Sequence, residues 1–364
     1  MTAVRVLQVL GFSTGGISRH VAQVTQALDG NGFEVDVAGP DDLPLKMPKP
    51  VLPVSIPSGP VRGHRAAVGR LRGIVGAGDY GIVHAHGLRA GIDAALAARG
   101  RCPVVLTVHN VVHPDVAGRT KYLAYKQAET LAVGLTAHTF AVSAEIATHL
   151  RKHPGARGKV EVLYLGIGDP PRVTRERSAV RAELGVAADE RLVVTASRLS
   201  AQKALPVMFE ALGAAATPFV LALLGTGPQE EELRRAAAEH GIAERVRWLG
   251  FRPDVADYIA AGDVFCLSSV WEGVPLAAQE AILLGVPVVA TAVGGMPELV
   301  DDAVTGRLVP PRDPAALAAA LRQVLASDAL RKTFADGAKK ALQKKFSTER
   351  MLARLAGEYR ERAR

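Results

Sequence analysis

Short runs of apolar residues alternate with helical patterns along almost the whole chain, and this alternation limits the possible folds most. A buried parallel strand needs about four to eight apolar residues, and a helix returns the chain to the start of the next one. The pattern therefore predicts an α/β class with parallel sheets covered by helices. We expect strands at residues 4–10, 33–39, 81–86, 103–109, 137–143 and 159–165, then at 191–197, 218–225, 245–250, 263–269, 287–291 and 306–310.

The alternation is interrupted at GIGDPPRVTR (166–175), where two glycines and two prolines predict a hinge. Because 364 residues are also more than a domain with a single hydrophobic core usually contains, we expect two doubly wound domains. Their predicted bounds are 1–168 and 169–346, and we expect helix 347–364 to pack back on the first domain. Ligands of such sheets bind at the carboxyl ends of the strands, so the predicted site is a cleft between the domains.

The start of the chain and its cysteines favour a cytoplasmic location. No apolar run approaches the roughly 18–20 residues that a membrane span needs. VRVLQVL (4–10) contains Arg5 and is followed by Gly11, which indicates a buried strand rather than a signal peptide. Cys102 and Cys266 lie beside strand-like residues, a setting typical of thiols that fill core space rather than of a disulfide or a metal site.

Positive charge is concentrated in the first domain. The formal net charge is +8; residues 1–168 contain 18 Lys and Arg against 11 Asp and Glu, and the remainder contains 26 against 25. The segment 61–76 combines apolar residues at near-helical spacing with arginines. Two interpretations stay open: a helix on its own sheet with a solvated basic face, or a peripheral contact with an anionic membrane. Nucleic-acid binding is not expected, because no aromatic residues interleave with this charge. The residues concerned are Val61, Val68, Leu71 and Ile74, with Arg62, Arg65, Arg70 and Arg72.

Gly15 and Gly16 in GFSTGGISRH (11–20) follow the first strand and precede a helix. Glycines at a helix start let backbone N–H groups approach an anion, and a tight turn explains them equally well.

Three histidines, His84, His86 and His109, end two strands of the first domain. They can meet a ligand in the cleft or simply cap strand ends by hydrogen bonding. His84 and His86 share one face of their strand, being two residues apart. Without a third ligand at suitable spacing, we do not expect them to bind a metal.

SRLSAQK (197–203) follows the first strand of the second domain and places Arg198 and Lys203 in one loop. Two cations at this edge are suited to hold a diphosphate, and a solvated surface loop is the alternative. The next strand ends in LLGTGP (223–228), where Gly225 marks a similar turn and is a further donor-site candidate.

WEGVPLAAQEAILLGVPVVAT (271–291) gives the strongest signal, with Glu272 in a turn and Glu280 on the helix that follows. N–H groups at the helix start are free donors for an anion or a sugar hydroxyl. Glu280 can accept hydrogen bonds from a diol such as ribose, and Glu272 can contact a sugar. The residues that open the helix are Gly273, Val274, Pro275 and Leu276.

Together these segments resemble the retaining GT-B glycosyltransferases of the glycogen-synthase and bacterial mannosyltransferase type (glycosyltransferase family 4-like, glycosyl transferases group 1). The resemblance covers essentially the whole chain. It implies a GT-B fold with an N-terminal acceptor domain and a C-terminal nucleotide-sugar domain. Two departures, Ala204 and Pro275 where the family usually has glycine, put the shape of two loops in doubt. The motifs are EGVPLAAQE, GVPVVATAVGGMPELV, TGRLVPPRD, SRLSAQK, GIVHAHG, LTVHN and GFSTGGISRH.

The resemblance implies roles for residues of the second domain. Arg198 and Lys203 would neutralise the donor diphosphate, and Glu280 would bind the ribose. Glu272, with the backbone of 273–276, would hold the transferred sugar.

The resemblance also implies roles for residues of the first domain and for the loop that binds the base. Gly16 would offer a backbone N–H to the diphosphate, Gly15 would belong to the same donor site, and His109 would contact the sugar near the reacting carbon. We expect largely backbone contacts to the base near Phe251 and Arg252.

No Asp-x-Asp triplet of the metal-dependent GT-A type occurs in the sequence, so we expect a metal-independent enzyme without a cofactor. The expected substrates are a UDP-, GDP- or ADP-sugar of hexose type and a hydroxyl acceptor: a glycolipid, a polysaccharide or a small molecule. Retention implies attack on the face from which the leaving group departs. The rival interpretations are a nucleotide-sugar epimerase or phosphorylase on the same fold, and a non-catalytic nucleotide-sugar-binding protein.

Overall fold

The computed structural model describes residues 3–13, 15–43, 45–59, 62–111, 118–215 and 217–363. The chain divides into two compact units. Unit 1 comprises Met1–Gly166 with Phe346–Arg364, and unit 2 comprises Ile167–Lys345. Each unit is a parallel sheet covered by helices, which confirms the predicted fold class.

The sheet of unit 1 has seven strands in the order β3-β2-β1-β4-β5-β6-β7, all pairs being parallel. The six strands predicted in this half are confirmed, with ends that differ by a few residues. β3 was not predicted, since it has only three residues and ends in a proline at the sheet edge. The strands are β1 (Val4–Leu10), β2 (Phe33–Gly39), β3 (Val51–Pro53), β4 (Ile82–His86), β5 (Val104–Val108), β6 (His138–Ala141) and β7 (Val160–Val162).

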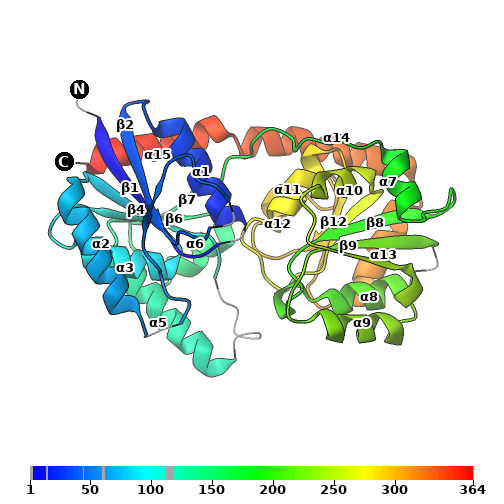
Figure 1. The fold of residues 1–364 in the computed structure, drawn as a ribbon. Helices are drawn as coiled ribbons and strands as arrows, with labels where there is room; N and C mark the ends of the chain where they lie inside the picture. Colours follow the sequence, from blue (N-terminus) through cyan, green and yellow to red (C-terminus); the bar gives the residue numbers. More distant parts are fainter. Residues whose placement is uncertain are drawn as a thin grey trace. The chain divides into compact units, whose positions relative to one another are not determined.

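Helices cover both faces of this sheet, α2, α3 and α5 on one side and α1 and α15 on the other (Figure 1). The apolar residues of β4, and those of β1 after Val4, are fully buried between these layers. The helices of unit 1 are α1 (Gly16–Leu28), α2 (His64–Gly78), α3 (Leu88–Ala98), α5 (Arg119–Leu135), α6 (Ala144–Leu150) and α15 (Thr348–Arg362).

Helix α2 lies in the basic segment that left two interpretations open. Leu71 is buried, and Val68 and Ile74 pack partly buried against the same core. The arginines of this segment are all exposed. The apolar side of α2 is therefore occupied by its own unit, and any membrane contact here would be electrostatic. Val61 lies outside the described residues.

The C-terminal helix α15, red in Figure 1, packs against α1 and β1 of unit 1. Met351, Leu355 and Tyr359 form its buried side. Arg354 binds both carboxylate oxygens of Glu161, at 2.9 and 2.6 Å. Unit 1 is thus built from two stretches of chain separated by the whole of unit 2.

The sheet of unit 2 has six parallel strands in the order β10-β9-β8-β11-β12-β13. All six predicted strands are confirmed. They are β8 (Arg191–Ala196), β9 (Phe219–Leu224), β10 (Val246–Gly250), β11 (Val264–Leu267), β12 (Val288–Thr291) and β13 (Arg307–Val309).

Helices α8, α9 and α13 cover one face of this sheet, and α7, α10, α11 and α14 lie on the other (Figure 1). Cys266 fills space in the core of this unit, and both it and Cys102 are free thiols. No helix in the described part of the chain is long and apolar enough to cross a membrane. The helices are α7 (Arg177–Glu183), α8 (Leu205–Gly213), α9 (Glu230–Glu239), α10 (Val255–Ala261), α11 (Leu276–Leu283), α12 (Met296–Leu299), α13 (Pro314–Leu325) and α14 (Asp328–Lys345), with the short η1 (Ala201–Lys203) and η2 (Ala243–Arg245).

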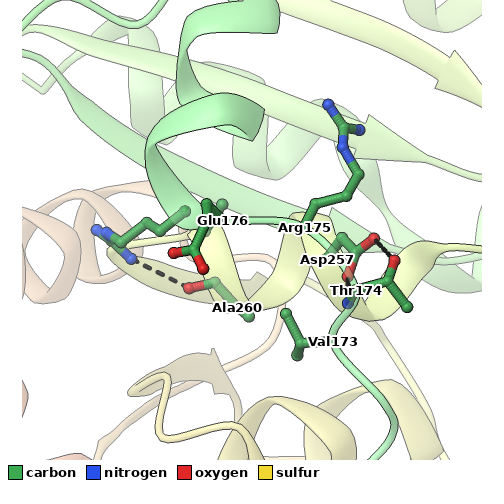
Figure 2. A pocket seen from close by; sticks show the side chains of 8 residues that line it. Val173, Thr174, Arg175, Glu176, Asp257 and Ala260 are labelled. Atoms are coloured by element: carbon green, nitrogen blue, oxygen red, sulfur yellow. Dashed lines mark hydrogen bonds between the residues drawn. The ribbon is translucent and has the colours of Figure 1, made fainter.

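The end of the segment predicted as a hinge is fixed to unit 2. Thr174 donates to Asp257 on α10, from its backbone N–H to Oδ1 at 2.7 Å and from its hydroxyl to Oδ2 at 2.8 Å. Figure 2 shows this contact beside a hollow lined by Val173, Glu176 and Ala260 among others. No residue predicted for the donor site lines the hollow, so it is not the candidate site.

Candidate functional site

The loops that follow β8 and β9 are joined edge to edge. Ser197 N–H donates to Leu224 C=O at 2.9 Å, and Leu199 N–H donates to Thr226 C=O at 3.0 Å. Gly225 has a φ of +125°, and a Cβ there would lie 1.9 Å from the Ser197 carbonyl oxygen. Only glycine fits at this position, so the SRLS loop and the GTG turn form one surface at the carboxyl edge of the sheet.

Lys203 and Glu272, predicted as separate parts of the site, form an ion pair in unit 2. Lys203 Nζ lies 2.5 Å from Glu272 Oε1, and the hydroxyl of Ser269 donates to the same oxygen at 2.6 Å. The Lys203 side chain is 15% exposed and that of Glu272 is 6% exposed. Because water is largely excluded, the pair holds both groups in fixed positions.

Arg198 is more exposed than Lys203, although both belong to one loop. Its side chain is exposed, and no ion pair with it is found within the described residues. It therefore presents a guanidinium at this edge, while the ammonium of Lys203 lies deeper against Glu272.

The turn from Glu272 to the start of α11 is shaped by Gly294 and Gly295, which follow β12. Gly294 has a φ of +58°, and a Cβ there would lie 2.0 Å from the Glu272 carbonyl oxygen. Gly295 N–H donates to the Gly273 carbonyl at 2.6 Å. These two glycines let the chains approach closely, so they fix where α11 begins.

Helix α11 begins at Leu276 with Pro275 as its N-cap, and no side chain caps it. The first-turn N–H groups of a helix have no partner within the helix, so this end carries donors and a partial positive charge. Glu280, half-buried, stands four residues after Leu276 and hence on the same side of the helix. Gly273 is buried and Val274 half-buried in the preceding turn.

Phe251 and Arg252 follow β10 at the same edge, where Gly225 N–H donates to the Gly250 carbonyl at 2.7 Å. The Phe251 side chain is 80% exposed. Arg252 is held by both oxygens of Asp254, at 2.9 and 2.8 Å, and lies over the ring of Tyr258. Its side chain is therefore already engaged within unit 2.

In unit 1, Gly15 is the N-cap of α1 and Gly16 its first residue. No side chain caps this helix, and a Cβ at Gly15 would meet nothing within 4 Å. Packing does not require glycine at position 15. Its absent side chain leaves the N–H groups of the first turn accessible.

His84 takes part in a buried hydrogen-bonded chain that reaches α15. Its Nδ1 lies 2.5 Å from the Tyr359 hydroxyl, and its Nε2 lies 2.7 Å from Thr107 Oγ1. Gln8 Nε2 donates to the same Tyr359 hydroxyl at 3.1 Å. His84 is thus a satisfied core histidine and does not reach the sheet edge.

The chain continues from Gln8 toward the edge. Gln8 Oε1 accepts from His86 Nε2 at 2.7 Å, and His86 Nδ1 lies 3.2 Å from His109 Nε2. With Nε2 of His86 as donor, its Nδ1 accepts the proton of His109 Nε2, which leaves His109 Nδ1 as an acceptor. Half-buried His109 is the end of this chain.

His20 lies against these rings, and its own ring nitrogens have no partner among the described residues. Ring centroids of His86 and His109 are 5.3 and 5.7 Å away. Desolvation lowers the pKa of His20 to about 4. Desolvation first, and neighbouring imidazoles second, hold the pKa of His84, His86 and His109 well below the ordinary value. All four rings are neutral at physiological pH.

Comparison with known proteins identifies the family to which the chain belongs. The model for "Glycosyltransferase Family 4" matches residues 14–169, and that for "Glycosyl transferases group 1" matches residues 176–341. A D-inositol 3-phosphate glycosyltransferase of Geodermatophilus obscurus is 32% identical in an alignment of 390 positions, gaps included. The alignment covers 95% of this chain and 84% of the relative. One of Mycolicibacterium gilvum is 30% identical over 355 residues, or 86% of this chain and 78% of the relative.

The chain belongs to the group 1 glycosyltransferases. As a member, it is an enzyme that uses a nucleotide sugar. This finding decides against the epimerase and the non-catalytic interpretations.

Solved structures agree on the GT-B fold of this glycosyltransferase. HepE of Anabaena superposes with a TM-score of 0.84 at 23% identity, over 98% of this chain and 100% of HepE. Sucrose-phosphate synthase of Thermosynechococcus elongatus also gives 0.84, at 22% identity and 98% coverage of both chains.

Several residues of the glycosyltransferase's candidate site were missed in the sequence. Gln8 left a signal, being a polar residue inside an apolar strand, and Gly294 and Gly295 stand within a motif quoted for the family. Ser269 and Tyr359 left none, because their contacts depend on strand order and on the return of α15.

Proposed function

We propose that this glycosyltransferase is a retaining, metal-independent hexosyltransferase that moves a sugar from a nucleoside diphosphate to a hydroxyl acceptor. The observation that carries the proposal is the desolvated Lys203–Glu272 pair at the start of α11, with Arg198 exposed in the same loop as Lys203. A diphosphate at this edge would meet two cations and the helix start. Glu272 would face the sugar, and Glu280 the ribose.

The main catalytic task is to stabilise charge that develops on the departing β-phosphate. Cations and helix N–H groups that are already in position do this without reorganisation. Arg198 can bind two phosphate oxygens through its planar fork, and Lys203 acts as a point charge. In this mechanism a phosphate oxygen takes the proton of the acceptor, which attacks on the face that the leaving group vacates.

From unit 1, we propose that Gly15 and Gly16 donate backbone N–H groups to the diphosphate and that His109 contacts the sugar. A neutral imidazole suits hydrogen bonding to a sugar hydroxyl, and the pKa of His109 is held low by its surroundings. His86 and Gln8 behind it fix the orientation of the ring. They are positioning residues.

A UDP-hexose and an inositol phosphate are the first substrates to test. HepE structures contain UDP and UDP-glucose, and the relatives are named for D-inositol 3-phosphate. A thermal-shift screen of UDP-, GDP- and ADP-sugars identifies the donor, since a ligand that binds the folded state raises the melting temperature. The anomeric configuration of the product, read by NMR, tests retention.

Lys203→Ala tests the site itself. Loss of one charge-stabilising donor should lower kcat/KM by about 10²–10³. Lys332→Ala is the control, because that side chain is 78% exposed and pairs only with Asp336 among the described residues. Unchanged turnover of Lys203→Ala would remove this residue from the mechanism, and strict dependence on Mn²⁺ would contradict metal-independent transfer.

A further inference from the structure

Glu129, His149 and His153 form a cluster in unit 1 that has no part in the proposed transfer. Glu129 lies on α5, His149 near the end of α6, and His153 in the turn that follows. Nε2 of His149 is 2.8 Å, and Nε2 of His153 3.0 Å, from the same oxygen, Glu129 Oε2. All three potential ligand atoms lie within 4.8 Å of one another.

The carboxylate of Glu129 is buried without a permanent positive charge beside it. Its side chain is 2% exposed, and its ion-pair partners among the described residues are the two histidines alone. A buried carboxylate is costly unless its charge is balanced. Either a proton on an imidazole or a bound cation must supply that balance, and a divalent metal does so with both imidazoles neutral.

The contacts of His153 match those of a metal ligand. Its Nδ1 lies 2.8 Å from Thr130 Oγ1, and the Thr130 hydroxyl donates to the Lys126 carbonyl at 3.0 Å. A hydroxyl has one hydrogen, so Thr130 then accepts from Nδ1–H of His153. Neutral His153 would direct the lone pair of Nε2 at the Glu129 oxygen, which is repulsive unless a cation lies between them. Metal-bound histidines typically donate their other N–H in this way.

We propose that Glu129, His149 and His153 bind one Zn²⁺ ion, with water completing the coordination. Two imidazoles and one carboxylate are a common zinc set, with bonds of about 2.0–2.2 Å, so the ligand atoms need to part by only a few tenths of an ångström. Mg²⁺ and Ca²⁺ prefer oxygen ligands. His149, 25% exposed, leaves the ion a route in from solvent.

The ion joins α5 to the end of α6, so its role is to stabilise unit 1. A zinc ion here would depart from the prediction that the chain has no metal site, which considered His84 and His86 and the absence of an Asp-x-Asp triplet. It leaves the metal-independent transfer as proposed, because none of the three residues of the cluster belongs to the proposed donor site.

Titration of the chelator-treated whole chain with Zn²⁺ tests the site. Calorimetry should give one ion per chain, and Co²⁺ should give the visible bands of a low-coordinate site. Saturating Zn²⁺ should raise the melting temperature by roughly 5 °C or more, and Mg²⁺ should not. The initial transfer rate at 25 °C should be the same with and without Zn²⁺. Absence of one-to-one binding, or a rate that requires Zn²⁺, overturns the proposal.

His149→Ala and Glu129→Gln assign the ion to these residues. Each should weaken Zn²⁺ binding at least about 100-fold, since even loss of an outer-shell partner costs 10–100-fold. His240→Ala, a histidine of unit 2, is the control for adventitious binding and should keep full affinity. His149 is partly exposed, so its substitution carries little risk to folding. If Glu129→Gln does not fold, the Zn²⁺ affinity of His149→Ala alone tests the proposal. Full affinity in His149→Ala overturns the proposal.

Discussion

Ala204 shows at the scale of one residue why a loop of this family usually contains glycine. Its φ of 43° and ψ of 42° lie in the left-handed region, between η1 and α8. The hydroxyl of Ser268 holds the turn, since its oxygen lies 2.9 Å from the Lys203 carbonyl oxygen and 3.1 Å from that of Ala204, and its one hydrogen can be donated to either. A left-handed residue with a Cβ costs about 1–2 kcal/mol, so the surrounding contacts enforce a strained backbone beside Lys203.

We expect Ala204→Gly to raise the free energy of unfolding by about 1 kcal/mol, because glycine adopts this conformation without the Cβ clash. Urea denaturation measures it. Ala319→Gly, at an exposed position inside α13, should lower the same quantity by about 1 kcal/mol. A loss in both variants would show that Ala204 is not strained.

His20 predicts how stability depends on pH. Between its ordinary pKa of 6.5 and its folded pKa of about 4, the unfolded chain binds a proton that the folded chain does not. The free energy of unfolding should therefore fall, by about 1.4 kcal/mol per pH unit, as the pH drops through this window. The lowered pKa values of His84, His86 and His109 act in the same direction.

Urea denaturation at several pH values, compared between the wild type and His20→Leu, measures this contribution. The variant should have a slope smaller by about one proton between pH 6.5 and 4. An unchanged slope in His20→Leu would mean that His20 is not the group that resists protonation.

The sequence was more informative about which residues matter than about how they pair. Arg198, Lys203 and Glu272 were found because each follows a strand that a pattern of apolar residues reveals. The pairing of Lys203 with Glu272 could not be predicted, since it depends on β11 lying beside β8 in the sheet. Strand order is a property of the whole unit and has no local signature.

At the scale of elements, α15 was expected as a helix, and its contribution to the site was not. The hydroxyl of Tyr359 connects this helix to the buried chain of hydrogen bonds, through Gln8 and His84. Strands buried on both faces were easy to find because most of their residues are apolar. The three-residue β3 at the sheet edge carries too few residues for such a pattern.

Tyr359→Phe should lower the free energy of unfolding by about 1–3 kcal/mol, because it leaves Gln8 Nε2 and His84 Nδ1 buried without a partner. Chemical denaturation of the whole chain, followed by hydrogen exchange in β1 and β4, measures the loss and its place. Tyr125→Phe removes a hydroxyl that bonds Arg89 nearer the surface and should cost less than about 1 kcal/mol. Equal losses in the two variants would contradict a special role for Tyr359.

At the scale of the molecule, the excess positive charge belongs to the N-terminal half, and the apolar side of α2 is covered. Peripheral contact with an anionic membrane stays a prediction, and it can rest only on charge. Co-sedimentation with vesicles that contain anionic lipid should then be strong at low salt and lost near 0.5 M, where screening is short-ranged. Neutral vesicles should bind nothing. Equal, negligible binding to both kinds of vesicle rejects the membrane contact.

The division of unit 1 into two stretches of chain affects how the protein is made. The segment that buries Met351, Leu355 and Tyr359 leaves the ribosome only after all of unit 2 has been synthesised. The first sheet must therefore wait, with part of its surface exposed, until the chain of the second unit has been made. Chaperones that shield apolar surface during translation should matter most for the half that is made first.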